Sequence, residues 1–401
     1  MTIARAGAAV VTYGNKIYVI GGVDGRIFLS SVEMAEVGEN GSLSPWRIVS
    51  RMPISRGFSS AAVFKKRVYV VGGGNGPYGK NLLRNIVSAP ILPSGQLGDW
   101  RIETEELLLP RRCSKLFVHQ DSLYALGGFG GSLLDNVEVA KINVNGELGE
   151  WSLLDNTLTR PRYVNSISKV GGYVFVIGGH HETKGVGIDS VEFTSLRSKP
   201  LSWDATHSLN QGRYAFSSIS YNDSVYALGG ISGNEYLNSV EELNISNGLE
   251  EASWQVSTKL PMKMANFMTI LVNKKLYILG GSTRQTYQQS VWYSGFNSNG
   301  EIGYWGTQIE RNEVLKSYNK SDQEVELHNS GVVVDRIDTE SYSYMLVNTG
   351  IKLIWLAAPS NAIKKDTKIR FSEGVFMSNF YSKSLRKNFE AILFVGAVKE
   401  E

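Results

Sequence analysis

The sequence predicts an all-β protein: a six-bladed propeller followed by a small domain resembling a β-sandwich or jelly roll. The main observation is an apolar run ending in a glycine pair, which recurs six times at intervals of 51 or 55 residues. The pairs are Gly21-Gly22, Gly72-Gly73, Gly127-Gly128, Gly178-Gly179, Gly229-Gly230 and Gly280-Gly281. This interval fits one four-stranded propeller blade per repeat.

Three further positions keep the phase of the glycine pairs. An aromatic residue stands three positions before each pair: Tyr18, Tyr69, Tyr124, Phe175, Tyr226 and Tyr277. A tryptophan follows 24 to 28 residues after the first glycine: Trp46, Trp100, Trp151, Trp203, Trp254 and Trp305. An arginine precedes the first glycine by sixteen residues in five repeats, and Met264 replaces it in the sixth; the arginines are Arg5, Arg56, Arg111, Arg162 and Arg213.

Each repeat contains the signals of four short antiparallel strands. A strand of small residues follows the arginine, and the apolar strand with the aromatic residue ends in the glycine pair, where the absence of Cβ atoms permits a sharp turn. A third strand carries a Ser-Val-Glu pattern, as at Ser31-Val32-Glu33. An Asn-Gly turn, such as Asn145-Gly146, then leads into the tryptophan strand.

On these residues the chain resembles the kelch-type β-propellers, from about residue 3 to residue 307. Three turns of the form Gly-x-Leu-Gly-x-Trp or its Ile variant, which end at Trp100, Trp151 and Trp305, also resemble repeats of bacterial surface proteins and of bacteriophage tail or fibre proteins. The resemblance implies a domain that presents binding loops. Kelch propellers usually close by exchanging a strand between the termini, whereas this chain starts at the first strand of a repeat. We therefore expect closure by face packing, alone or with help from the segment after Trp305.

The composition favours a soluble all-β protein. Of 401 residues, 42 are glycine and 20% are charged, and the formal net charge is +3. This near balance predicts no strong affinity for nucleic acid, and no apolar run is long enough to insert into a membrane. The single cysteine, Cys113, excludes an intrachain disulfide, and the N-terminus does not resemble a signal peptide. We expect a virion or cell-surface location without a cleavable signal, with a cytoplasmic location as the alternative.

The repeat pattern ends after residue 307. Residues 308–330 are polar and predict a linker that contains one helical turn, and residues 331–401 predict a small all-β domain. Its five expected strands are Val332–Ile337, Tyr342–Val347, Lys352–Ala358, Lys368–Phe371 and Ala391–Val398. Such a domain suits docking or oligomerisation, so a homo-oligomer is expected. The basic run Lys364–Arg370 alternates with apolar residues, which favours a strand with one solvated face over a nucleic-acid contact.

The repeated arginines are the candidate ligand-binding residues. Rotational repetition places Arg5, Arg56, Arg111, Arg162 and Arg213 in a ring near one mouth of the central channel, where guanidinium groups would hold a carboxylate or sulfate. The alternative is structural: each arginine fastens a loop carbonyl or the glutamate of the Val-Glu pattern. Both interpretations stay open at this point.

Other chemistry finds little support in the sequence. Gly72–Gly76 lacks the lysine and helix of a phosphate-binding loop, and no catalytic serine, metalloprotease or paired-cysteine motif is present. His180-His181 beside Glu182 is a weak metal candidate, because adjacent side chains usually point apart. We therefore predict no catalytic residue, no metal and no cofactor.

Two function classes follow. In the first, the protein is a non-catalytic structural or interaction component of a virion (tail, fibre or decoration) or of a cell-surface appendage. Its partners are then other structural proteins of the assembly and, as a further candidate, a host-surface glycan. The propeller presents loops such as Gly74–Asn81 and His180–Gly187, and residues 331–401 anchor it. In the second, the resemblance to kelch proteins that act on sugars, such as a sialic acid mutarotase, implies binding or isomerisation of an anionic sugar in the channel.

Overall fold

A computed structural model describes the chain except residues 182–185, 298–299, 304, 308–326, 328, 340–341, 351, 373, 383–384 and 396. The chain divides into two compact units, Met1–Gln308 and Ile309–Glu401. Most of the predicted linker lies outside the described residues, and Asn329 and Ser330 already belong to a strand of the second unit. Among the described residues, no helix is long and apolar enough to cross a membrane.

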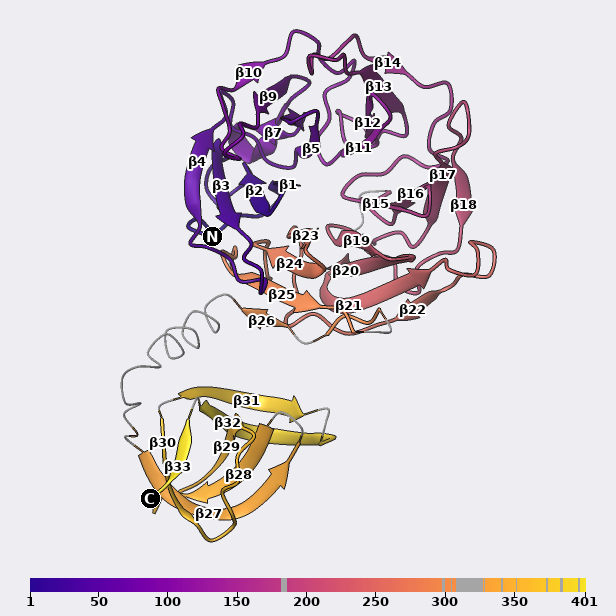
Figure 1. Cartoon of the computed structure of the whole chain (residues 1–401). Coiled ribbons are helices and arrows are strands. Elements are labelled where there is room, and N and C mark those ends of the chain that lie inside the picture. The colour runs from indigo at the N-terminus through magenta and orange to yellow at the C-terminus, as the bar shows by residue number, and fades with distance from the viewer. Residues whose placement is uncertain are drawn as a thin grey trace. The chain divides into compact units, whose positions relative to one another are not determined.

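The first unit is a ring of six four-stranded antiparallel sheets (Figure 1). Blade 1 contains β1 (Ala9–Tyr13), β2 (Lys16–Ile20), β3 (Ser31–Glu36) and β4 (Arg47–Arg51). Blade 2 contains β5 (Ser60–Phe64), β6 (Arg67–Val71), β9 (Ile86–Pro90) and β10 (Arg101–Ile102). Blade 3 contains β11 (Lys115–His119), β12 (Ser122–Leu126), β13 (Val137–Lys141) and β14 (Ser152–Leu153). Blade 4 contains β15 (Ser166–Val170), β16 (Tyr173–Ile177), β17 (Val191–Ser195) and β18 (Asp204–Thr206). Blade 5 contains β19 (Ser217–Tyr221), β20 (Ser224–Ser232), β21 (Glu235–Asn244) and β22 (Trp254–Val256). Blade 6 contains β23 (Met268–Val272), β24 (Lys275–Leu279), β25 (Val291–Gly295) and β26 (Gly306–Thr307).

The first strand of each blade lies nearest the axis of the ring, as Figure 1 shows, and the fourth lies outermost. The loop between the second and third strands of blade 2 adds a small hairpin, β7 (Gly74–Asn75) and β8 (Asn81–Leu82), with the 3-10 helix η1 (Pro77–Gly79) between them. Since each of six successive stretches of the chain forms one four-stranded antiparallel sheet, the predicted six-bladed propeller is confirmed. Among the described residues, no blade contains a strand from the other end of the repeat region.

The glycine pairs are explained by a close approach between blades. The nitrogen of Gly22 donates a hydrogen bond to the carbonyl of Arg56 in the segment that leads into blade 2, at 2.9 Å. A Cβ atom on Gly21 would lie 2.4 Å from the same carbonyl oxygen, and Gly21 has a φ of 63°. The pair therefore needs both the small size and the left-handed conformation of glycine. The equivalent backbone bond recurs at all six junctions.

The repeated tyrosines join neighbouring blades. Tyr69 of blade 2 is buried, and its hydroxyl donates to the carbonyl of Gly146 in the outer turn of blade 3, at 2.6 Å. The same bond, which we call the tyrosine latch, joins Tyr18 to Gly95, Tyr226 to Gly300 and Tyr277 to Gly41. The aromatic residue three positions before each glycine pair thus has a structural role wherever it carries a hydroxyl group that reaches this turn.

The ring closes between blade 6 and blade 1. A hydrophobic cluster fills this junction, as it does each of the other five, and contains Ile17, Tyr277 and Leu279. The N-terminal segment adds backbone hydrogen bonds, from Arg5 to the carbonyl of Gln288 and from Gly281 to the carbonyl of Arg5. Closure therefore depends on face packing supported by the residues that precede β1.

The second unit is all-β, as predicted, but its strands form one hydrogen-bonded sheet rather than two. The strands are β27 (Asn329–Asp338), β28 (Tyr342–Asn348), β29 (Leu353–Pro359), β30 (Lys368–Phe371), β31 (Gly374–Ser382), β32 (Lys387–Val395) and β33 (Val398–Glu400), in the order β31-β32-β29-β28-β27-β30-β33. The predicted five strands omitted β31 and treated β32 and β33 as one. The pair β29 and β32 is parallel.

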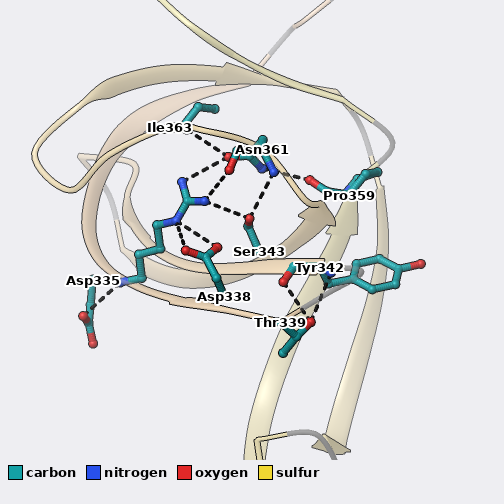
Figure 2. A network of polar contacts seen from close by, with 9 residues as sticks. Asp335, Asp338, Thr339, Tyr342, Ser343, Pro359, Asn361 and Ile363 are labelled. Carbon is teal, nitrogen blue, oxygen red and sulfur yellow. Dashed lines mark hydrogen bonds and ion pairs between the residues drawn. The ribbon is translucent and has the colours of Figure 1, made fainter.

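A polar network fixes one end of this second sheet (Figure 2). The guanidinium group of Arg336 donates to both carboxylate oxygens of Asp338, at 2.9 and 2.7 Å, to the hydroxyl of Ser343 at 3.0 Å and to the side chain and carbonyl of Asn361. The network ties the loop after β29 to strands β27 and β28. Because its groups satisfy one another, its role is structural.

Candidate functional site at the axis of the propeller

The five sequence-predicted arginines are buried inside their blades. Each side chain is 0% exposed. In each, Nη1 donates to the carbonyl of the first glycine of its own blade's pair, at 2.8 to 3.0 Å. The acceptors are Gly21 for Arg5, Gly72 for Arg56, Gly127 for Arg111, Gly178 for Arg162 and Gly229 for Arg213. These guanidinium groups are occupied by backbone rather than presented to a ligand.

Four of the arginines also pair with the glutamate of the third strand. Nη2 of Arg5 lies 2.5 Å from Glu33, and Nη2 of Arg213 lies 2.5 Å from Glu241. The other two pairs are Arg111 with Glu138 and Arg162 with Glu192. Each carboxylate also accepts a backbone N–H from the segment that precedes its arginine. Burial lowers the pKa of the arginines, and the glutamates oppose this shift.

Blades 2 and 6 depart from this pattern in different ways. In blade 2 the glutamate position is Val87, so Arg56 donates instead to the side chain of Asn85, at 2.6 Å. Burial without a carboxylate lowers the pKa of Arg56 to about 10. In blade 6 both members are replaced together, by Met264 and Trp292. The expected ring of ligand-facing arginines is therefore corrected: desolvated guanidinium groups need acceptors, and the blade supplies them to both terminal nitrogens, while each Nε is buried without a partner among the described residues.

The residue after each arginine occupies a different environment. It forms an isolated β-bridge with the residue that follows the glycine pair, and the six bridges make what we call the bridge ring. The bridges are Ala6 with Val23, Gly57 with Gly74, Arg112 with Phe129, Tyr163 with His180, Tyr214 with Ile231, and Ala265 with Ser282. Blades 3, 4 and 5 thus carry large side chains where blades 1, 2 and 6 carry small ones.

The large side chains of the bridge ring contact one another across blades 3 to 5. The guanidinium of Arg112 lies over the ring of Phe129, at 5.1 Å from its centroid. The rings of Phe129 and Tyr163 are 6.1 Å apart, those of Tyr163 and His180 5.5 Å, and those of His180 and Tyr214 4.5 Å. We call these five residues the aromatic arc. His180 is buried and the other four are half-buried.

A second ring lies directly beside the bridge ring and ties the inner segments together. Its members have φ between 47° and 57° and are Gly7, Phe58, Cys113, Val164, Ala215 and Asn266. Five backbone hydrogen bonds of 2.6 to 2.9 Å run from member to member between neighbouring blades. This hub ring fixes the positions from which the aromatic arc projects. Burial raises the pKa of the Cys113 thiol to about 11, so that the thiol stays protonated at neutral pH.

Two cations near the aromatic arc have no carboxylate partner among the described residues. Arg112 makes one long hydrogen bond, of 3.4 Å, to the carbonyl of Gly79, and Lys115 begins the inner strand β11. Burial lowers the pKa of the Lys115 amine. Burial also raises the pKa of the Tyr163 and Tyr214 hydroxyls, which keeps both protonated as donors. The unpaired cations and the two hydroxyl donors could hold an anionic group by charge-assisted hydrogen bonds.

The structure also locates the described residues of two other candidates, the histidine pair His180-His181 and the basic run Lys364–Arg370. His180 packs within the aromatic arc, while Glu182 lies outside the described residues. Among the residues that the structure describes, no three His, Cys, Asp or Glu side chains gather as metal ligands do. In the basic run, Lys368 and Arg370 are exposed and alternate with buried Ile369, which confirms the predicted solvated face.

The aromatic arc was not predicted from the sequence, although Arg112, Tyr163 and Tyr214 each lie one position after a predicted arginine. The arginines repeat, whereas the arc residues differ from blade to blade. The available signal was this difference: after the arginine stand Ala6, Gly57, Arg112, Tyr163, Tyr214 and, after Met264, Ala265. A repeat position that the fold leaves free to vary is where a ligand site can be built.

The comparisons with known proteins agree with this architecture. The family model described as Kelch motif matches residues 4–34 and 212–249. Alpha-scruin of Limulus polyphemus is 25% identical over 252 residues, which cover 59% of this chain and 26% of alpha-scruin. Spermatocyte protein spe-26 of Caenorhabditis elegans is 26% identical over 174 residues, which cover 43% of this chain and 28% of that protein.

A solved structure gives the same fold. The structure of YjhT superimposes with a TM-score of 0.62 over 75% of this chain and 97% of that chain, at 15% sequence identity. The first unit is therefore a six-bladed kelch-repeat β-propeller, a fold of the protein-interaction type. The match spans less than a third of the length of the two relatives named above.

Proposed function

We propose that the propeller is a non-catalytic recognition module and that the second unit anchors it in a larger assembly, such as a virion appendage or a cell-surface structure. The observation that carries the first part is the exposure of apolar side chains on loops between second and third strands. These are Ile27 (61% exposed), Tyr78 (91%), Val186 (66%) and Tyr287 (42%). They come from four different blades.

Strand connectivity supports a common binding face for these residues. Every loop between second and third strands leaves its blade at the same end, next to the bridge ring. Apolar side chains gathered at one end of a protein commonly mark an interaction site. The aromatic arc lies at the same end, because Phe129 and His180 begin the loops of blades 3 and 4. This end is therefore the proposed recognition face.

The anchoring role is supported by the separate sheet of the second unit, whose edge strands β31 and β33 each pair with one neighbour. Multi-angle light scattering tests it, with the full chain compared with a variant that ends at Thr307. We expect a multimer for the full chain and a monomer for the shortened one. Two monomers would contradict anchoring through self-association.

A second candidate function is binding of a small anionic sugar at the aromatic arc. The specific support is Arg112, a half-buried cation stacked on Phe129 with no carboxylate partner among the described residues. Titration calorimetry with N-acetylneuraminate and glucuronate tests this candidate. Binding that disappears in Arg112→Met would support it, and no heat from either sugar would remove it.

A further inference from the structure

The junction between blades 4 and 5 lacks the tyrosine latch. The latch position of blade 4 is Phe175, which has no hydroxyl group to donate. The outer turn of blade 5 is also longer: six positions separate Gly248 from Trp254, whereas five separate Gly146 from Trp151 in a latched turn. The outer turn of blade 5 therefore lacks the tyrosine hydrogen bond that ties each latched turn to the neighbouring blade.

A groove of about 800 Å³ lies where this latch is missing. Its apolar floor consists of Tyr173, Phe193 and Leu249, all half-buried. The ring centroids of Tyr173 and Phe193 are 5.7 Å apart at an interplanar angle of 72°. The rest of the lining is Asp204, Ala205, Thr206, His207, Asn247, Gly248, Glu250 and Glu251.

The groove carries an excess of negative charge on a protein whose net charge is positive. Asp204, Glu250 and Glu251 are exposed, and none of their carboxylates has an ion pair or hydrogen bond with another described residue. The lining contains no lysine or arginine. Some exposed acids elsewhere on the propeller have a cationic partner, as Asp121 has in Lys65 at 3.0 Å. The groove differs in gathering three unpaired carboxylates around an apolar floor.

We propose that this groove binds an arginine side chain of a basic segment of a partner protein. A guanidinium group is weakly hydrated and planar, so it stacks on aromatic faces while its N–H groups donate to carboxylates at the edge. The half-buried rings of Tyr173 and Phe193 supply the first contact, and the three carboxylates supply the second. The inference is independent of the recognition face proposed above, because the lining residues lie on other strands and turns.

The test is a binding titration of the full chain with a fluorescently labelled hexa-arginine peptide, followed by anisotropy at low salt. The variant Asp204→Asn/Glu250→Gln/Glu251→Gln should weaken binding at least tenfold. A matched control removes three exposed carboxylates from latched turns: Glu39→Gln/Asp99→Asn/Glu150→Gln. The control carries the same change in net charge and should bind within twofold of the unaltered chain.

Aromatic stacking is tested separately with Phe193→Leu, after its thermal unfolding shows that the variant is folded. This variant should weaken hexa-arginine severalfold and hexa-lysine less, because the ammonium group does not stack as a guanidinium does. Equal losses in the groove variant and the control would overturn the proposal, as would absence of hexa-arginine binding to the unaltered chain. An unchanged affinity in Phe193→Leu would overturn the stacking geometry and with it the preference for arginine.

Discussion

Two adjacent layers of the propeller, one built from the repeated arginines and one from the residues that follow them, show opposite behaviour. In the first layer, Arg111 is fully buried and bonded to Gly127 and Glu138 of its own blade. In the second layer, Arg112 is half-buried and stacks on Phe129 within the aromatic arc. The residues that repeat therefore stabilise each blade, whereas the variable residues at the next position give each blade a different surface at the bridge ring.

The largest expected effect comes from breaking a buried pair of the first layer. Arg162→Met leaves the carboxylate of Glu192 buried without its cation, and we expect a loss of about 3–5 kcal/mol in unfolding free energy. Urea denaturation followed by tryptophan fluorescence measures it. The double variant Arg162→Met/Glu192→Trp copies blade 6 and should lose less than the single variant. An unchanged unfolding free energy in Arg162→Met would show that the ion pair with Glu192 does not stabilise the blade.

A smaller loss is expected where the arginine has no carboxylate. Arg56→Met leaves only the carbonyl of Gly72 and the backbone and side-chain oxygens of Asn85 without this donor, and neutral groups cost less to leave unbonded than a charge. We expect a loss of about 1–3 kcal/mol in the same denaturation experiment. If Arg56→Met cost as much as Arg162→Met, the glutamate would not be the source of the difference between blades.

The tyrosine latch should contribute less again. Tyr69→Phe removes one hydroxyl and its bond to Gly146, and we expect a loss of about 0.5–1.5 kcal/mol. Tyr124→Phe is the matched control, because Tyr124 makes no latch with the described residues of blade 4. Differential scanning calorimetry compares the two midpoints. A larger shift in the control would contradict the structural task assigned to the latch.

The sequence predicted the propeller well because the same residues meet the same local structural requirement in each of the six blades. The glycine pairs require a positive φ and a close backbone approach in every blade, and the pairing of arginine with the Val-Glu glutamate was one of the two interpretations drawn from the repeat. The aromatic arc was not predicted, since Arg112, Tyr163 and His180 come together only through the ring of blades. In a single sequence, Arg112 and Tyr163 are marked only by variation at the position after the repeated arginines.

The second unit was predicted less completely for a related reason. Strands such as Lys368–Phe371 follow from alternation, and the structure reproduces that range. The parallel pairing of β29 with β32 joins residues far apart in the sequence, such as Trp355 and Ile392, and no local signal specifies it. Local alternation therefore indicated strands but not the single sheet in which they pair.

Two neighbouring arginines, Arg111 and Arg112, belong to different layers and can be compared directly. The unfolding free energies of Arg111→Met and Arg112→Met, measured in urea under identical conditions, separate the two layers. We predict a loss of about 3–5 kcal/mol for Arg111→Met, because Glu138 loses its buried partner. For Arg112→Met we predict a smaller loss of about 0.5–1 kcal/mol, because its cation–π contact with Phe129 is removed. Equal losses would contradict the division into a layer that holds the blades and a layer that is free to bind.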